Sequence, residues 1–320
     1  MNPDGTNVNT LLEIEIGEGD EFVGMNADPT GRYLVYGVGR RDGEGAPVFY
    51  LVENGKAQLI GQYRRLPRWD PAGKRIVGQG FDANVAQFVS NIAMFDVEFK
   101  EHYGLGIDGP ADWFPDGKRL VYVLDDNVWA VDLGNEQTTQ LTDLPSTEDN
   151  PWYVQEAHVT PDGEEIVFYA GQRQNVGASG NGMQWWRVPA AGGDAKPLTG
   201  PGGNGVSSVQ WGDTDLLSFI ESAHESACVS HQYVGLRTLA DEEAVNSPTL
   251  EGLGNEDPIM VNALSWAPSR DALVFGVRPY TCSPDLQQLV YGDPKLYVWL
   301  PGSSNTAFPI GAGSYPVWTK

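Results

Sequence analysis

Short apolar runs separated by turns recur along the whole chain. One phrase precedes most of them: Pro-x-Gly, one or two charged residues, and then an apolar stretch rich in β-branched and aromatic residues. Full copies lie at residues 28–36, 69–77, 113–122 and 160–168, degraded copies at 211–219 and 266–275, and a truncated start at 315–318. The copies are spaced by about 42 to 55 residues, a period typical of repeat architectures.

Each phrase predicts a tight hairpin between two strands. Proline presets φ at the first turn corner, and Asp-Gly supplies a self-capping side chain and a residue that tolerates positive φ. A second pair of strands follows in each repeat, for example residues 127–132 and 138–142. Four short strands per repeat predict the blade of a β-propeller, because solenoid coils are shorter and a β-sandwich does not repeat its hairpin so regularly.

We therefore expect an all-β fold, a β-propeller of four-stranded antiparallel blades, as a single domain over residues 1–320. Two strands are left over, at residues 11–16 and 315–318, and together they predict a composite seventh blade closed by both termini; a six-bladed ring is the alternative. A short helical turn is allowed for at residues 238–245. Inner strands of the six complete repeats are expected to begin near Met25, Pro67, Ala111, Ala157, Val209 and Leu264.

The third repeat carries a family resemblance. Residues 113–122 read Trp-Phe-Pro-Asp-Gly-Lys-Arg-Leu-Val-Tyr, followed by Val-Trp-Ala-Val-Asp-Leu at 128–133 and Gln-Leu-Thr at 140–142. This series resembles the WD40-like repeat of TolB-like propellers, and the resemblance covers nearly the whole chain. It implies the propeller fold, whereas nothing in the sequence resembles the separate N-terminal domain of TolB.

The composition and net charge of the chain exclude some classes of binding partner. The chain is globular, at 41% hydrophobic and 11% aromatic, and 43 Asp+Glu against 20 Lys+Arg give a net charge of −23. Such an acidic chain is unsuited to the phosphates of nucleic acid or to anionic lipid. No apolar run approaches the ~18 residues of a membrane span, and no signal peptide is present in this sequence. We expect a monomer.

Strand alternation places the Pro-Asp-Gly turns and the short turns between third and fourth strands on one face. All other connections lie on the opposite face, the long-loop face. Because loops on a rigid scaffold often carry function, we expect this to be the working face, although long loops are also thermodynamically tolerated. The long insertions on it are residues 40–46, 81–90, 144–153, 171–184, 222–230, 241–257 and 279–294.

Sequence motifs for catalysis are missing. The string Gly-Ala-Ser-Gly-Asn at 177–181 lacks the spacing of a serine-hydrolase elbow, and the four histidines lack zinc-ligand spacing. His158 begins the inner strand of the fourth repeat, aligned with Asp112 of the third. Propeller lyases that resemble this architecture hold a metal on several converging histidines. His158 is alone in an inner strand, so we interpret it as structural and expect no metal and no cofactor.

Most tryptophans share repeat positions and are interpreted as packing residues between or within blades. Trp152 and Trp185 are left over, the first beside Tyr153 in a loop between blades and the second at the end of a long Gly/Asn/Ser loop. Aromatic residues exposed on a rim stack on sugars or enter a partner, or they cover a local apolar gap. The candidate ligand-binding residues are Trp152, Tyr153, His158 and Trp185.

The two cysteines bear on the cellular compartment in which the protein works. Cys228 and Cys282 lie in matching loops of the fifth and sixth repeats, which adjacent blades bring together, so we expect a disulfide; two unrelated thiols are the alternative. A disulfide places the protein outside the cytoplasm, periplasmic or secreted.

The expected function is a non-enzymatic binding or scaffolding propeller of the TolB-like type with a protein or carbohydrate partner on the long-loop face. The alternatives are a carbohydrate lyase or hydrolase with a site at the channel mouth, and a structural domain of a longer protein.

Overall fold

The computed structural model describes residues 6, 12–41, 45–80, 91–107, 109–147, 149, 151–172, 183–198, 205–212, 215–224, 230–239, 247–254, 257–283 and 288–318. The regular structure of these residues is all β-strand, and no helix among them has the length and apolar character needed to cross a membrane. Two compact units are distinguished by their internal contacts. The N-terminal unit comprises residues 10–174, 185–197 and 319–320, and the C-terminal unit comprises residues 1–9, 175–184 and 198–318.

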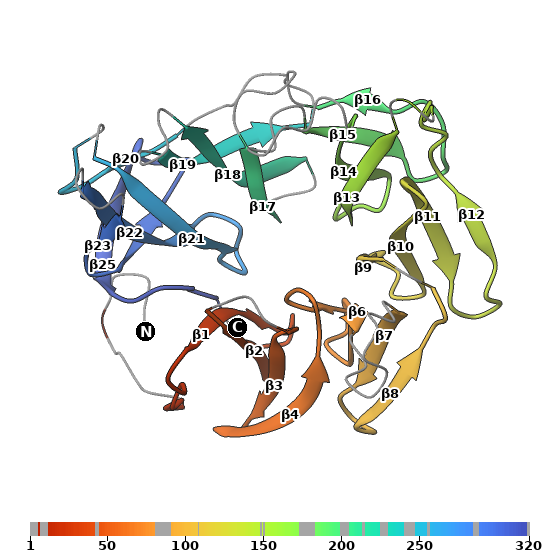
Figure 1. Cartoon of the computed structure of the whole chain (residues 1–320), viewed down its shortest axis with the longest axis horizontal. Coiled ribbons are helices and arrows are strands. Elements are labelled where there is room, and N and C mark those ends of the chain that lie inside the picture. The colour runs from red at the N-terminus through yellow and green to blue at the C-terminus, as the bar shows by residue number, and fades with distance from the viewer. Residues whose placement is uncertain are drawn as a thin grey trace. The chain divides into compact units, whose positions relative to one another are not determined.

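The N-terminal unit contains four antiparallel sheets, each with four strands in chain order (Figure 1). The strands are β1 (Asp20–Ala27), β2 (Tyr33–Arg40), β3 (Val48–Glu53) and β4 (Lys56–Gln62); β5 (Arg68–Trp69), β6 (Arg75–Gly80), β7 (Asn91–Asp96) and β8 (Glu101–Gly104); β9 (Ala111–Trp113), β10 (Arg119–Leu124), β11 (Asn127–Asp132) and β12 (Thr138–Gln140); β13 (Trp152–Val159), β14 (Glu165–Gln172), β15 (Gln184–Pro189) and β16 (Lys196–Pro197).

The C-terminal unit contains two sheets. The first has three strands, β17 (Gly205–Trp211), β18 (Leu216–His224) and β19 (Ser230–Thr238). The second is built from β20 (Thr249–Leu250), β21 (Ile259–Trp266), β22 (Leu273–Ser283), β23 (Gln288–Tyr291), β24 (Lys295–Trp299) and β25 (Thr306–Ala312). These sheets and those of the N-terminal unit are the blades of a β-propeller, so the predicted fold class is confirmed.

The Pro-x-Gly phrases form the predicted hairpin turns. Asp70 accepts backbone hydrogen bonds from Lys74 at 2.7 Å and from Arg75 at 3.1 Å, and Asp116 accepts the equivalent pair in the next blade. The turn glycine has positive φ in each of the four copies, between 63° and 77°. Proline, aspartate and glycine therefore act at this turn as local chemistry predicts.

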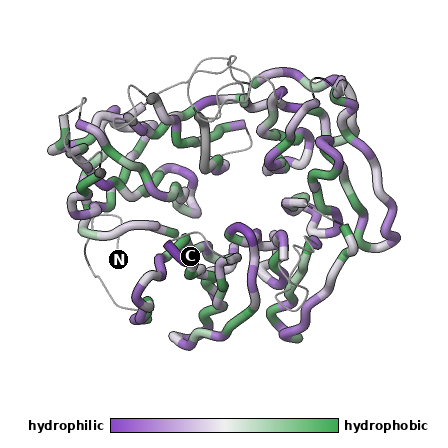
Figure 2. The backbone as a smooth tube through the Cα atoms, viewed as in Figure 1, coloured by the Kyte–Doolittle hydropathy of each residue, from purple (hydrophilic) through white to green (hydrophobic). Residues whose placement is uncertain are grey.

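Hydrophobic and hydrophilic positions alternate along many strands (Figure 2), and the apolar positions form cores between neighbouring sheets of one unit. The tryptophan that precedes the turn packs on the preceding blade: the indole N–H of Trp113 donates to the Arg68 carbonyl at 3.2 Å, and Arg75 lies 4.6 Å over the Trp113 ring. The interpretation of Trp113 as a packing residue is confirmed by its burial.

Several inner strands are longer than predicted. β13 begins at Trp152 rather than near Ala157, and β1, β17 and β21 also begin about five residues early. Each of these strands contains a β-bulge, which in β13 falls between Val154 and Glu156. The extra pairing draws Trp152 out of the predicted loop and into the core, where its ring meets Trp186 edge-on at 5.1 Å between centroids.

Two further expectations are corrected. Residues 12–16 and 315–318 are not in strands, so the composite seventh blade is not formed by the described residues. The described part of the fifth blade lacks a fourth strand, because β20 pairs in parallel with β25 of the sixth sheet instead. The helical turn expected at 238–245 and the long insertions at 81–90, 171–184 and 222–230 lie largely outside the described residues.

We expect Trp113→Ala and Trp152→Ala each to lower the free energy of unfolding by roughly 3–5 kcal/mol, since both buried rings would leave cavities. Denaturant unfolding measures this. Tyr153→Ala, at the exposed neighbour in the same strand, is the matched control and should cost less than about 1 kcal/mol. Equal losses for Trp152→Ala and Tyr153→Ala would contradict the core position of Trp152.

Candidate functional site

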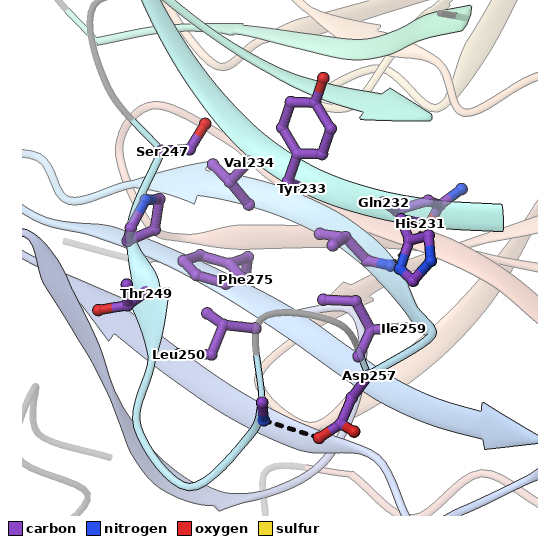
Figure 3. Close-up of a pocket in the computed structure, with 13 residues that line it drawn as sticks. His231, Gln232, Tyr233, Val234, Ser247, Thr249, Leu250, Asp257, Ile259 and Phe275 are labelled. Atoms are coloured by element: carbon purple, nitrogen blue, oxygen red, sulfur yellow. Dashed lines mark hydrogen bonds between the residues drawn. The ribbon is translucent and has the colours of Figure 1, made fainter. Parts of the chain in front are cut away.

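Each unit has a pocket lined by described residues. The pocket of the C-terminal unit has a volume of about 270 Å³ and lies among β19, β20 and β21. Its walls are mostly apolar, and Figure 3 shows Val234, Leu250 and Phe275 at its centre. The one carboxylate in its lining, Asp257, accepts the backbone N–H of Gly254 at 2.7 Å. This pocket can give a ligand apolar contacts, but few charged groups line it.

The pocket of the N-terminal unit has about the same size, 290 Å³, and a different chemistry. Its wall comes from the segment before β5, the β10–β11 turn and the start of β13. Arginine, aspartate, glutamine and tyrosine side chains line it: Arg64, Arg65, Gln79, Asp125, Asp126, Tyr153 and Gln155. All of these segments are strand starts or connections between second and third strands, so the pocket lies on the predicted long-loop side of these blades.

Local backbone geometry builds this pocket. Asp125 and Asp126 both have positive φ, 48° and 57°, which is the geometry of a two-residue turn that suits a twisted hairpin. Gly109 approaches the Val123 carbonyl so closely that a Cβ there would collide with the oxygen. Gln155 is the extra residue of the β13 bulge, and bulges commonly redirect side chains beside binding sites.

A buried charged network lies next to the pocket. His158 on β13 donates from Nδ1 to the Asp112 carboxylate on β9 at 2.9 Å, and its Nε2 lies 3.8 Å from Glu156 Oε2. The same Glu156 oxygen accepts from the Arg65 guanidinium at 2.9 Å. Arg65 is also a pocket residue, so one side chain belongs to both the network and the pocket.

The network fixes the charge of its members. Burial and the positive charge of Arg68 work against a charged His158, but the hydrogen bond to Asp112 and the nearby carboxylate of Glu156 outweigh them and raise its pKa. Burial alone would raise the pKa of Glu156, whereas His158 and Arg65 lower it to about 2. The pKa of Asp112 is likewise held below its usual range by His158 and Arg68 despite burial. Both ring nitrogens of His158 thus face carboxylates that stay ionised.

The four candidate residues from the sequence have different surroundings. Trp152 and Trp185 are buried, which favours the alternative that they fill local apolar gaps over exposure on a rim. Trp185 stacks obliquely on Tyr169, 5.2 Å between centroids, and lies 6.0 Å from the His158 ring. His158 is buried, as a structural histidine should be. Tyr153 is exposed and lines the pocket, so its predicted binding role continues as a proposal.

Sequence reasoning missed the charged partners of His158. Arg68, Asp112 and His158 occupy one repeat position, three residues before the turn proline of three successive blades. The alignment of Asp112 with His158 was visible, but extending it to Arg68 would have revealed alternating charge at that position. Arg65 and Glu156 are 91 residues apart and share no local pattern.

The remaining expectations concern metal binding and the two cysteines. No group of three or more His, Cys, Asp or Glu side chains in the described residues is placed to hold a metal ion. Cys282 lies in β22, while Cys228 lies outside the described residues, so the Cys228–Cys282 disulfide stays a prediction.

No protein-family model and no curated protein matches this sequence. Solved structures match in fold. An oligogalacturonate lyase from Vibrio parahaemolyticus has a TM-score of 0.58 at 13% identity, over 91% of this chain and 77% of the lyase. The β-propeller domain of the Trilobed protease from Pyrococcus furiosus has a TM-score of 0.53 at 12% identity, over 93% of this chain and 85% of that one.

A prolyl endopeptidase matches with a TM-score of 0.54 at 14% identity, over 88% of this chain. This chain spans only 43% of the length of that peptidase. The matches also include a TolB protein from Agrobacterium tumefaciens, at 14% identity and a TM-score of 0.42. The structures with TM-scores above 0.5 confirm the propeller fold that the resemblance to TolB-like propellers implied.

The network predicts a defined pH dependence of stability. His158 has a raised pKa in the folded state, so its contribution is present below about pH 6.5 and is lost as the pH rises through the folded value. Asp112 and Glu156 have lowered pKa values, so their contribution is present above about pH 4.5 and is lost as the pH falls through the folded values. The whole network is strongest between about pH 4.5 and 6.5.

We expect His158→Gln to lower the free energy of unfolding by about 1.5–3 kcal/mol near pH 5.5, and by clearly less at an alkaline pH above the raised folded pKa of His158. Urea denaturation at the two pH values measures the difference. His102→Gln on the outer strand β8 is the control: burial lowers the pKa of His102, so its loss should not cost more stability at the acid pH than at the alkaline pH. An equal effect of His158→Gln at both pH values would contradict a charged His158.

Proposed function

We propose that this chain is a non-enzymatic binding propeller that takes a carbohydrate ligand in the pocket beside Arg65 and Tyr153. The observation that carries this proposal is the mixed polar lining of that pocket. Arginines only donate hydrogen bonds, carboxylates only accept them, and glutamine amides do both. A hydroxyl both donates and accepts, so a hydroxyl-rich ligand suits such a lining better than a purely anionic or purely apolar ligand does.

Two further features support a sugar ligand. Tyr153 offers an exposed aromatic ring at the pocket wall, and aromatic rings pack against the apolar faces of sugars while their hydroxyl remains wet. Arg64 and Arg65 provide planar guanidinium groups that would also accommodate a carboxylate on an acidic sugar. The pocket volume is near the lower end of the range for small-ligand sites and suits one end of an oligosaccharide.

The buried network supports binding over catalysis. A general base needs a free nitrogen or oxygen within reach of the substrate. His158 is buried, carries its proton between two carboxylates, and does not line the pocket. Its chemistry is that of a positioning residue: it holds Glu156, which in turn holds Arg65 at the pocket.

Binding is tested by calorimetry with neutral and acidic oligosaccharides, namely cello-, xylo-, chito- and galacturonate oligomers. We expect Arg64→Ala and Tyr153→Ala each to weaken binding at least about tenfold, or about 1.4 kcal/mol. Phe99→Ala, at an exposed aromatic residue outside the pocket, should leave binding unchanged. Binding by none of these oligomers, or equal binding by all three variants, would contradict the proposal. Conversion of an oligomer to shorter or unsaturated products would favour a lyase or hydrolase.

We also infer that the protein works outside the cytoplasm as a monomer with a Cys228–Cys282 disulfide. The inference is supported by the matching positions of the two cysteines in the sequence repeats, with Cys282 placed in β22 rather than in the predicted loop. The bridge would close a loop of 50-odd residues and contribute on the order of 4 kcal/mol in the chain-entropy model. Thiol titration of unfolded, unreduced protein should find no free thiol. Two free thiols per chain in material kept from reducing agents would contradict both the bridge and the location.

A further inference from the structure

The hairpin formed by the end of β22 and by β23 extends beyond the strands beside it; both strands are labelled in Figure 1. β21 begins opposite Pro279, and β25 ends opposite Lys295, so neither reaches the hairpin. In the part of the chain that the structure describes, β23 pairs with β22 alone. A two-stranded ribbon has little stability of its own in water, so a third strand would stabilise it.

The outer edge of β23 presents backbone groups that can pair with such a strand. Gly292 donates its N–H to the Pro279 carbonyl at 2.8 Å, which sets the phase of the ladder between the two strands. Bonded and non-bonded residue pairs alternate along an antiparallel ladder. The N–H and C=O groups of Leu289 and Tyr291 therefore point away from β22, and no backbone group of the described residues bonds to them.

The side chains on this edge are apolar and accessible. Leu289, Val290 and Tyr291 are consecutive, and their exposed fractions are 40%, 59% and 41%. Edge strands of soluble proteins usually carry charge or proline, which blocks pairing with another chain. Two outer strands of the N-terminal unit are more polar, namely Glu-His-Tyr-Gly of β8 and Thr-Thr-Gln of β12. β23, Gln-Leu-Val-Tyr, carries no charge and no proline.

We propose that the β23 edge docks an extended, basic segment of a partner protein, which adds a strand to the hairpin. In this mode of recognition the main chain supplies hydrogen bonds and alternate side chains supply apolar contact. Its basic character is inferred from the charge of the unit as a whole: residues 198–318 contain 13 acidic and four basic residues, within a chain of net charge −23. One of the four, Arg278, lies 4.8 Å over the Tyr291 ring, so the basic side chains of the partner are expected to meet the acidic surface around the edge rather than Tyr291 itself. The net negative charge repels a second copy of this chain, which makes self-pairing the weaker choice.

None of these residues lines the pocket beside Arg65, so this surface is separate from the proposed sugar site. The test uses the full chain and a fluorescent peptide in which valine alternates with lysine. Fluorescence anisotropy should show saturable binding. A peptide with proline at alternate positions, which cannot pair along an edge, and a peptide with glutamate in place of lysine should each bind at least tenfold more weakly.

Two variants locate the contact. Val290→Lys places a typical edge-blocking charge on β23, and we expect it to weaken the valine–lysine peptide at least tenfold; Val290→Thr, which keeps the strand preference but removes apolar surface, should weaken it less. Leu59→Lys is the matched control, because Leu59 is 57% exposed on the outer strand β4. Equal binding by Val290→Lys and wild type, or equal loss in Leu59→Lys, would overturn the proposal. Sedimentation showing a wild-type dimer that Val290→Lys dissociates would instead assign the edge to a second copy.

Discussion

In the N-terminal unit, the turn glycines of the second, third and fourth blades lie against the turn of the preceding blade. A Cβ on Gly73 would meet the Asp28 carboxylate at 2.6 Å, and a Cβ on Gly163 would meet Pro115 at 3.3 Å, while both glycines also have positive φ. The positive φ and the close contact therefore both require glycine at these positions. The contact sets how far one blade is offset from the next, so residues at the same distance from their turns come to lie side by side. The charged network depends on this offset, because Asp112 and His158 stand equally far before their turn prolines.

That network ties the first strands of neighbouring blades and the segment before β5 into one polar layer. Its strength comes from charges that are each compensated, since a buried charge without a partner is costly. Such a layer gives a rigid base for Arg65 but leaves His158 without a lone pair to accept a proton. The same interactions that hold the site together thus make its histidine a poor general base.

Much of the fold follows from local chemistry that the sequence displays. The Pro-x-Gly turn and the apolar run after it specify a hairpin wherever they occur, and tryptophan recurs at Trp69 and Trp113 because the second and third blades both bury this ring. The predicted loop position of Trp152 was wrong, because the strand that contains this residue also contains the bulge at Gln155. An inserted residue disturbs the alternation of apolar and polar positions by which a strand is recognised in a sequence. The Arg65–Glu156 pair could not be predicted, since only the packing of separate blades brings the two side chains together. Apolar and polar residues alternate over 12–16 as in a strand, but these residues pair with no other described strand. Alternation alone does not indicate which strand would be the partner.

Because β20 pairs in parallel with β25, a sequence repeat and a sheet do not contain the same residues at this point of the chain. By the period of the chain, Thr249 and Leu250 belong to the fifth repeat, yet their backbone completes the outer edge of the sixth sheet, and the Tyr297 hydroxyl donates to the Glu251 carbonyl just beyond them. Repeats joined in this way are not interchangeable modules. Duplicating, deleting or recombining the fifth repeat along its sequence boundaries would move the edge strand of its neighbour, so the last two repeats are expected to be inherited, and engineered, as a pair.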